Sequence, residues 1–210
     1  MGHDYYILED GEQTGPFSFD ELTDIGLEIH TRVLSTLTDE WQDACDLPEF
    51  YPYFESHGIY FPTGDNLASF WWRLLAFLID YVIISVLLTI LFIMAIQFGL
   101  TIKIPTVDDI MKFSFIERLR VMSVIYIALI IYNSAGEASS MEGSFGKKLC
   151  RLVVVNIDGE RLSYPKALLR SVGKAVSFFI NGLGFLTVFF SEHRQALHDY
   201  LAKSYVVKLD

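Results

Sequence analysis

The sequence predicts an α-helical integral membrane protein that carries a small α+β domain at its N-terminus. The 210 residues are 52% hydrophobic and 15% aromatic, more than a soluble domain of this length usually carries. Residues 1–66 hold 15 of the 26 acidic residues but only one of the 16 basic residues. The rest of the chain therefore has a surplus of basic residues. This division predicts an acidic part in water, followed by a membrane part with basic loops.

The N-terminal segment lacks the features of a cleaved signal peptide. MGHDYYILEDGEQ is polar and has neither a basic start nor an apolar stretch, so we expect the first part of the chain to stay in the cytoplasm. Cys45 and Cys150 fall in different parts and match no metal or disulfide spacing. Such a pattern suits a reducing compartment. We therefore expect two free thiols and no metal site.

Residues 1–50 predict the small α+β domain. A short apolar strand leads into an Asp-Gly turn. Ser18 and Glu21 have the spacing of a capping box, which predicts a short helix directly after Ser18. Residues 31–37 (TRVLSTL) favour a second strand, and we expect the polar stretch that opens at Trp41 to be helical.

Several aromatic and turn residues of this domain form a motif: Tyr5-Tyr6, Gly15-Pro16-Phe17, Glu21-Leu22 and Trp41. The motif resembles the GYF-related domains found at the N-termini of many bacterial membrane proteins. This chain lacks the tripeptide Gly-Tyr-Phe, so it is similar to the divergent branch. The resemblance implies that a proline-rich peptide binds in an aromatic groove, with Tyr6, Phe17 and Trp41 as candidates. Alternatively, these three rings fill the small core.

A segment rich in proline and aromatic residues follows. Residues 48–64 hold three prolines and six aromatic residues, and we expect neither helix nor strand there. We therefore treat residues 51–66 as a linker between domains at 1–50 and 67–210. One interpretation is that the segment occupies the groove of the first domain as an internal ligand. The other is that its rings rest at the membrane interface.

Residues 67–210 predict two clear crossings and a third, broken or re-entrant apolar segment. Residues 81–102 form an uncharged run of 22, which exceeds the roughly 20 residues that one crossing needs. Residues 121–136 form an uncharged run of 16, the second crossing. Residues 175–191 form a run of 17 with an Asn-Gly pair and a further glycine at its centre. A single helix would place the tail outside, whereas a re-entrant hairpin would return it to the cytoplasm.

The loop between the second and third apolar runs is basic. Residues 143–174 carry seven Lys and Arg residues, which places this loop in the cytoplasm. We therefore expect a multi-pass protein of the bacterial cytoplasmic membrane with its N-terminal domain inside. The loop also predicts a strand at residues 152–157 and an amphipathic helix from Pro165. We interpret Lys166, Arg170 and Lys174 of that helix as facing anionic lipid headgroups.

Two charges lie in the first apolar segment. Arg73 and Asp80 are seven residues apart, so on a helix they share a face but stand about 10 Å apart along the axis. Each therefore needs a partner from elsewhere, because unpaired charges are costly in a membrane. Near the C-terminus, Arg194, His198 and Asp199 supply charged and polar candidates. We expect Arg73 to meet Asp199 and Asp80 to face the interior of the bundle.

These charges belong to a longer pattern: Arg73-x-x-Ala76-x-x-x-Asp80, Gly143-Ser144-x-Gly146-Lys147, Asp158-Gly159 followed by Arg170, and Arg194-x-x-Leu197-His198-Asp199. The pattern resembles the RDD family of small bacterial membrane proteins, named for one arginine and two aspartates. The resemblance implies transport, including cation/proton exchange, for some members. In that hypothesis Asp80 is the exchangeable carboxylate, and Arg73 with Asp199 tunes or gates it. Gly143, Gly146 and Lys147 form the loop motif.

Transport is the preferred hypothesis, with the lipid bilayer, a monovalent cation and a proton as partners. Three apolar segments offer little material for a transport pathway within one chain, which suggests a homo-oligomer. The rival hypothesis is a membrane-anchored adaptor that recruits a proline-containing partner through the GYF-related domain, while the buried charges lock the helices together. We expect no enzyme and no cofactor, because His193 and His198 accompany no catalytic or cofactor pattern. We also expect no nucleic-acid partner.

Overall fold

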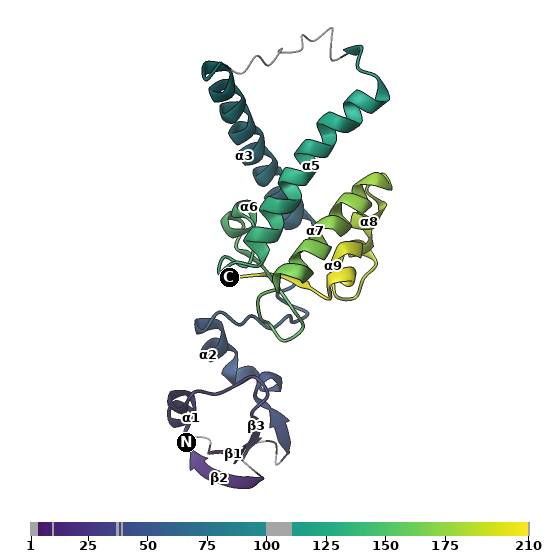
Figure 1. The fold of residues 1–210 in the computed structure, drawn as a ribbon. Helices are drawn as coiled ribbons and strands as arrows, with labels where there is room; N and C mark the ends of the chain where they lie inside the picture. The colour runs from purple at the N-terminus through teal and green to yellow at the C-terminus, as the bar shows by residue number, and fades with distance from the viewer. Residues whose placement is uncertain (1–3, 10, 37, 39, 100–110, 210) are drawn as a thin grey trace. The chain divides into compact units, whose positions relative to one another are not determined.

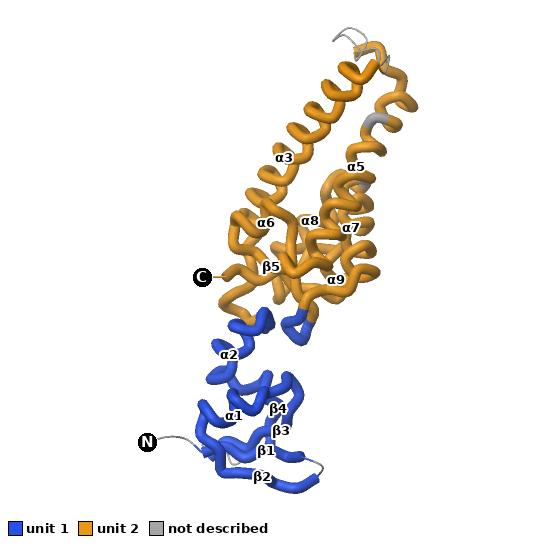
Figure 2. Tube along the Cα trace, turned by 60° about the vertical axis from the view of Figure 1, so that its left-hand side comes forward, with its two compact units in different colours: residues 1–61, 157–160 blue, residues 62–156, 161–210 orange. Residues whose placement is uncertain are grey.

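The computed structural model describes residues 4–209, apart from residues 10, 37, 39 and 100–110. The chain forms two compact units (Figure 2). Unit 1 comprises residues 1–61 together with residues 157–160, and unit 2 comprises residues 62–156 and 161–210.

Unit 1 contains an antiparallel sheet of four strands in the order β2-β1-β3-β4 (Figure 1). The strands are β1 (Tyr5–Glu9), β2 (Glu12–Phe17), β3 (Arg32–Ser35) and β4 (Trp41–Asp43). The predicted helix is confirmed as α1 (Phe19–Ile25), and it begins with the expected capping box between Ser18 and Glu21. The short α1 buries Leu22 against the sheet side of the core.

The helix expected at Trp41 is wrong. Trp41–Asp43 forms the edge strand β4, with Trp41 opposite Leu34 of β3, and only the short 3-10 helix η1 (Ala44–Asp46) follows. An aromatic residue beside an apolar cross-strand partner stabilises a strand. This long-range pairing outweighs the polar character of the segment.

The segment expected to be an irregular linker is instead part of unit 1. It forms the 3-10 helix η2 (Pro48–Phe50) and helix α2 (Tyr51–Ser56). Phe50, Phe54 and Phe61 are buried in the same core as the strand residues. Both interpretations of the segment, as an internal ligand and as an interface anchor, are therefore wrong for these three rings. A small domain needs large aromatic side chains to complete its core.

Residues 157–160 complete unit 1 from a distant part of the sequence. The backbone N–H of Tyr60 donates to the carbonyl oxygen of Gly159 at 2.8 Å. Gly159 has a φ of +77°, and a Cβ there would lie 2.9 Å from the carbonyl carbon of Tyr60. The positive φ favours glycine at this position, and the close approach to Tyr60 is a second reason for it.

Unit 2 is built on two long helices, α3 (Phe70–Gln97) and α5 (Phe115–Glu137), which diverge away from the short helix α6 (Figure 1). Helix α7 (Tyr164–Phe179) packs along α5 and against α9. The remaining elements are α6 (Phe145–Leu149), β5 (Leu152–Val155), α8 (Leu183–Leu186), η3 (Thr187–Phe189), α9 (Leu197–Ala202) and β6 (Tyr205–Lys208).

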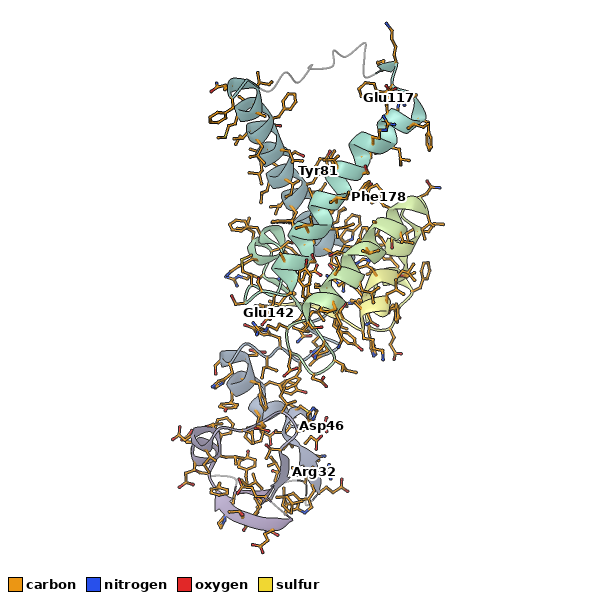
Figure 3. The ribbon with its side chains drawn as sticks, viewed as in Figure 1. Arg32, Asp46, Tyr81, Glu117, Glu142 and Phe178 are labelled. Carbon is orange, nitrogen blue, oxygen red and sulfur yellow. The ribbon has the colours of Figure 1, made fainter. Side chains whose placement is uncertain are left out.

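Among the described residues, α3 alone is by itself long and apolar enough to cross a membrane. Its large apolar side chains remain exposed, for example Val82 at 60% and Val86 at 54%. Figure 3 shows the side chains of α3 beyond Tyr81, and of α5 towards Glu117, projecting away from the other elements. An exposed apolar surface of this length fits contact with lipid. The second crossing, over α5, stays a prediction.

The third apolar run is broken, as expected. Helix α7 on the one hand, and α8 with η3 on the other, are long and apolar enough to cross a membrane only when taken together, and the chain bends by 114° between them. Asn181 and Gly182 lie at the bend, and both have a positive φ, 56° and 80°. Glycine adopts such angles readily and asparagine more easily than most residues.

The C-terminal tail returns to the basic loop. Strand β6 pairs antiparallel with β5, from Leu152 opposite Lys208 to Val155 opposite Tyr205. The two alternatives for the third apolar run were a single helix and a hairpin that returns the tail. The structure has the second, because the tail lies beside the basic loop. The strand itself was not expected from the sequence. It buries Val206 in a core with Ala76 of α3 and Cys150.

Candidate functional site

Three helices of unit 2 turn polar side chains towards one another. Residues that are four or seven positions apart lie on the same face of a helix. The pairs with this spacing are Arg73 and Asp80 on α3, Asn133 and Glu137 on α5, and Arg170 and Lys174 on α7. Short helices α6 and α9 add Lys147 and Asp199. The result is a charge cluster, defined here as Arg73, Asp80, Glu137, Lys147, Arg170, Lys174 and Asp199.

Asp199 is one centre of the charge cluster and is fully buried. Arg73 Nη1 donates to its Oδ2 at 2.5 Å, and Arg170 donates to its Oδ1 from Nη2 at 2.6 Å and from Nε at 2.9 Å. The expected pairing of Arg73 with Asp199 is therefore confirmed. Burial alone would raise the pKa of Asp199, but the guanidinium groups of Arg170 and Arg73 hold it well below its ordinary value. Asp199 is therefore ionised.

Glu137 is the second centre, and its side chain is also fully buried. Its Oε1 accepts hydrogen bonds from Arg170 Nη1 at 2.6 Å, Lys147 Nζ at 2.6 Å and Lys174 Nζ at 2.7 Å. Arg170, which is 1% exposed, thus bridges both carboxylates. The interpretation of Arg170 and Lys174 as lipid-facing is wrong, because a buried carboxylate attracts them inward. Lys166 is exposed.

Sequence reasoning missed Glu137 and did not place Arg170 in this site. Glu137 directly follows the second apolar run, and its spacing of four residues from Asn133 was the available signal. Lys147 and Lys174 both lie 3.5 Å from Asn133 Oδ1 through their Nζ atoms. Asn133 and Glu137 therefore face the two lysines together.

Asp80 joins α3 to α6. Its Oδ1 accepts from the Tyr132 hydroxyl at 2.9 Å and from the backbone N–H of Gly146 at 2.7 Å, and its Oδ2 accepts from the Ser144 hydroxyl. A Cβ on Gly146 would overlap the carbonyl oxygen of Ala76 and lie 2.8 Å from Asp80 Cγ. Glycine at this position therefore lets α6 lie directly on α3.

The loop motif also shapes the end of α5. Gly143 donates its backbone N–H to the Gly136 carbonyl oxygen at 3.2 Å, and a Cβ on Gly136 would lie 2.7 Å from the Gly143 carbonyl oxygen. This close approach brings Lys147 to Glu137. Of the three motif residues, Gly143 and Gly146 serve close packing and Lys147 enters the charge cluster.

His198 and Arg194 differ in their surroundings. His198 is buried, with Nε2 3.4 Å from Asp199 Oδ1. Burial, aided by nearby cations, lowers the pKa of His198 to about 3, so it is neutral at pH 7. Arg194 is exposed and donates to the carbonyl oxygen of Leu67 at 2.7 Å. Arg194 therefore lies outside the charge cluster, contrary to expectation, because Arg73 and Arg170 already occupy Asp199.

A cavity of about 500 Å³ opens between α3, α5 and α7 of unit 2. Its polar lining includes Arg73, Asp80, Asn133, Lys147, Arg170, Lys174 and His198, and most of these side chains belong to the charge cluster. Its walls include Leu74, Phe77, Tyr126, Leu129, Ile130 and Phe178. A concave, mostly apolar space with a few converging polar groups is typical of a small-molecule site.

The candidate peptide residues of unit 1 divide between two faces of the sheet. Tyr6 pairs with Leu34, and Leu34 pairs with Trp41, so these three side chains share one face. All three are half-buried. Phe17 pairs with Tyr5, whose side chain lies in the core. Tyr6 and Trp41 are therefore on the outer face, and Phe17 packs with the core.

Comparison with known proteins assigns both parts of the chain. The profile of the RDD family matches residues 67–203. The chain belongs to the RDD family. The profile of GYF domain 2 matches residues 5–50. An uncharacterized protein of Bacillus subtilis (strain 168), YxaI, is 34% identical over 146 residues, which cover 67% of this chain and 96% of YxaI. No solved structure matches.

The charge cluster, and every residue that lines the cavity except Val206, lie within the segment that matches the RDD family. Arg73, Asp80 and Asp199, which the sequence pattern singled out, all lie within this segment. An RDD family match and one long apolar helix together make this a membrane protein. The carboxylates of these aspartates have different partners, guanidinium groups for Asp199 and uncharged donors for Asp80.

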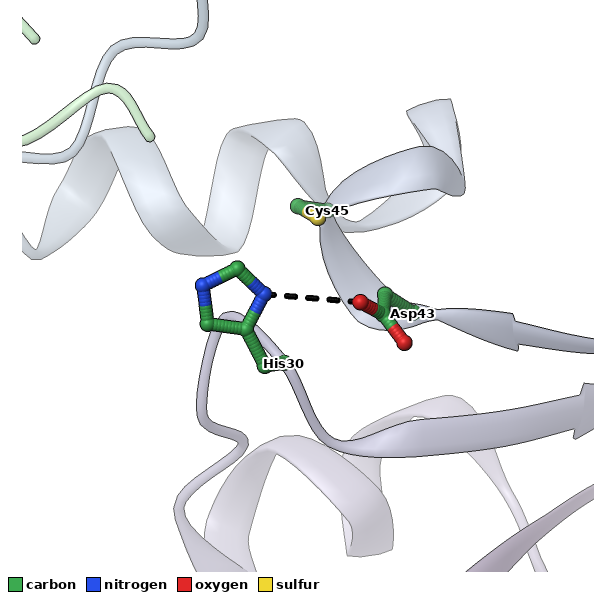
Figure 4. Close-up of side chains that lie close together, drawn as sticks. All are labelled: His30, Asp43 and Cys45. Carbon is green, nitrogen blue, oxygen red and sulfur yellow. Dashed lines mark hydrogen bonds and ion pairs between the residues drawn. The ribbon is translucent and has the colours of Figure 1, made fainter. Parts of the chain in front are cut away.

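One group of potential metal ligands occurs among the described residues of this RDD protein, in unit 1 (Figure 4). His30, Asp43 and Cys45 each offer a ligand atom, and these atoms lie within 4.8 Å of one another. Asp43 also accepts from Arg32 Nη1 at 3.2 Å. A metal ion would therefore compete with Arg32 for Asp43. The absence of a metal site stays a prediction.

Glu142 is a buried carboxyl of the RDD domain outside the charge cluster. It lies between α5 and α6, is 8% exposed, and its Oε2 has no hydrogen-bond partner among the described residues. Burial raises the pKa of Glu142 from 4.5 to about 7, and Arg161 offsets only part of this shift. The protonated form is therefore favoured in the folded protein below about pH 7.

This raised pKa predicts a pH dependence of stability. Between pH 4.5 and about 7 the unfolded chain loses the Glu142 proton while the folded protein keeps it, so the free energy of unfolding falls as pH rises. Thermal unfolding from about pH 5 to about pH 8 should show a decline that the Glu142→Gln variant lacks. Parallel curves for the two proteins would contradict the prediction.

Proposed function

We propose that this RDD protein binds a small charged solute in the cavity between α3, α5 and α7 and carries it across the bacterial cytoplasmic membrane, with unit 1 in the cytoplasm. The observation that supports this proposal is the charge cluster beside the cavity. Seven ionisable side chains converge at helix α3, which is otherwise largely apolar and carries two of them, Arg73 and Asp80. Ionisable groups in such a place are costly and typically mark solute or ion pathways.

Cation/proton exchange, which the family resemblance suggests, would use Asp80. This carboxylate lines the cavity, and a buried carboxylate can hold a proton and a cation alternately. Its oxygens accept hydrogen bonds from Tyr132, Ser144 and Gly146. Exchange therefore requires these donors to withdraw from Asp80, Tyr132 on α5 as well as Ser144 and Gly146 at the start of α6. A homo-oligomer would supply additional helices for such a pathway.

A proton-flux assay tests the exchange hypothesis. Purified protein in liposomes should produce proton flux under imposed sodium, potassium or lithium gradients, and Asp80→Asn should abolish it because an amide neither ionises nor exchanges a proton. The matched control is Asp65→Asn, which changes an exposed aspartate of the same unit. Flux that survives in folded Asp80→Asn protein would refute a role for this carboxylate, and no flux in the wild type would refute exchange.

The second candidate is a membrane-anchored adaptor. The half-buried face formed by Tyr6, Leu34 and Trp41 in the GYF-type unit favours it, because aromatic faces bind proline-rich segments. Removal of residues 1–61 distinguishes the two candidates. A transporter should keep its proton flux without this segment. An adaptor should show no proton flux with or without the segment, and it should no longer bind its partner when the segment is removed.

A further inference from the structure

The charges that border the cavity do not balance. Four cations line it, and they are Arg73, Lys147, Arg170 and Lys174, whereas Asp80 is the single lining carboxylate among the described residues. Counting the two carboxylates behind the wall, Glu137 and Asp199, the charge cluster holds three negative groups and, with Lys174 protonated, four positive groups. Burial lowers the pKa of Lys174 to about 7, although Glu137 favours its charged form. A buried positive surplus favours an anionic partner.

The negative groups of the charge cluster are already occupied. Asp80 accepts from three donors, Tyr132 of α5 and Ser144 and Gly146 at α6, and Asp199 pairs with two arginines. Glu137 receives three cationic donors on one oxygen, and it does not line the cavity. A metal cation entering the cavity would therefore meet lysine and arginine side chains with few carboxylate oxygens to bind it.

Hydrogen-bond donors, in contrast, remain available in the polar lining. Arg73 Nη2 is buried and has no partner among the described residues. Each lysine ammonium has three hydrogens, and for Lys147 and Lys174 the short contact is the one with Glu137. Donors that converge on a cavity with positive charge suit an oxyanion, such as a carboxylate or a phosphate.

The rest of the cavity is suited to a hydrocarbon chain. Its apolar lining includes Phe77 of α3, Leu129 of α5 and Phe178 of α7. Helix α3 exposes apolar side chains over most of its length, so an amphiphile from the bilayer would meet a continuous apolar surface. The volume of about 500 Å³ lies within the usual range of small-ligand sites.

We propose that this cavity binds a single acyl chain with an oxyanionic head, with the head at Arg73 and Lys174 and the chain along Phe77, Leu129 and Phe178. The proposal rests on the proposed function, since it names the class of solute that the cavity holds, and this class differs from the cation of the exchange hypothesis. The shared chemistry is a carboxylate or phosphate head on one hydrocarbon tail.

Binding of radiolabelled palmitate to the purified full-length protein in non-ionic detergent tests the proposal. Unlabelled palmitate and 1-palmitoyl-lysophosphatidic acid should both compete, and the stronger competitor identifies a fatty carboxylate or a lipid phosphate as the natural head. Cetyltrimethylammonium, with a similar tail and a cationic head, should not compete. Equal competition by this cation, or by inorganic phosphate without a tail, would overturn the proposal.

Two variants locate the site. Lys174→Gln should weaken palmitate binding about tenfold or more, because it removes a charge-assisted donor while Glu137 keeps Lys147 and Arg170. The matched control is Lys166→Gln, an exposed position of the same helix, which should bind as the wild type does. Ala175→Phe should obstruct the tail, since Ala175 lines the cavity. Unchanged binding in both cavity variants would overturn the assignment.

The outcome separates this site from transport. Palmitate binding that Lys174→Gln weakens, without cation-driven proton flux in liposomes, would keep the anion site and refute exchange at Asp80. Cation-driven flux in a protein that binds no palmitate would keep transport and refute the anion site.

Discussion

Arg170→Met is expected to destabilise the RDD domain by about 3–5 kcal/mol, the usual cost of removing one partner from a buried ion pair. Arg170 is 1% exposed and bridges Glu137 and Asp199. Methionine fills a similar volume but leaves both carboxylates with one guanidinium fewer. Asp199 would keep Arg73, and Glu137 would keep its two lysines. The loss of stability would therefore measure how much Arg170 contributes by joining α7 to α5 and α9.

Thermal unfolding of the purified protein in detergent measures this effect. Lys148→Met is the control, because Lys148 is an exposed basic residue of the same unit and its replacement should change little. Arg170→Lys provides a finer comparison. Lysine keeps the charge but lacks the planar fork that binds both carboxylates, so it should recover only part of the stability. A melting temperature of Arg170→Met equal to that of Lys148→Met would refute the bridging role.

Gly146→Ala is expected to cost about 3 kcal/mol, the upper end of the range for overpacking. The added Cβ would overlap the Ala76 carbonyl oxygen and lie 2.8 Å from Asp80 Cγ. The Ala76 carbonyl belongs to the backbone of α3, which cannot rotate away as a side chain would. Relief therefore requires α6 to move off α3 and to weaken the hydrogen bond from Gly146 to Asp80.

The sign of this effect is informative, because helix propensity alone would favour alanine over glycine by about 1 kcal/mol. A lowered melting temperature would therefore report the close packing of α6 on α3. Gly64→Ala is the matched control, since a Cβ there meets no atom within 4 Å and its φ is not positive. A Gly146→Ala protein as stable as Gly64→Ala would show that the two helices lie further apart than described.

Part of the candidate site could be predicted from sequence because burial of charge in a membrane has few solutions. Arg73 needs a carboxylate, and few charged residues adjoin an apolar segment near the C-terminus. That reasoning identified Asp199, which Arg73 contacts at 2.5 Å. The same reasoning placed Asp80 in the interior, where it is 3% exposed.

The remaining members of the charge cluster could not be predicted in the same way. A lysine or arginine on an amphipathic helix satisfies an anionic headgroup as well as a buried carboxylate, and sequence spacing does not separate these cases. Arg170 and Lys174 turn inward because Glu137 lies opposite them, a contact that spans 33 and 37 residues of sequence. The position of Glu137 on another helix therefore determines that these two side chains point inward.

Features that depend on neighbouring residues could be predicted from the sequence. These are the apolar helix, the capping box at Ser18, the break at Asn181-Gly182 and the need of Arg73 for a partner. Features that join distant segments became known only from the packing of the chain. These are the aromatic segment that completes the core of unit 1, the pairing of β5 with β6, and the carboxylates that Arg170 bridges. Local patterns fix periodicity and turns, whereas burial depends on which surfaces meet.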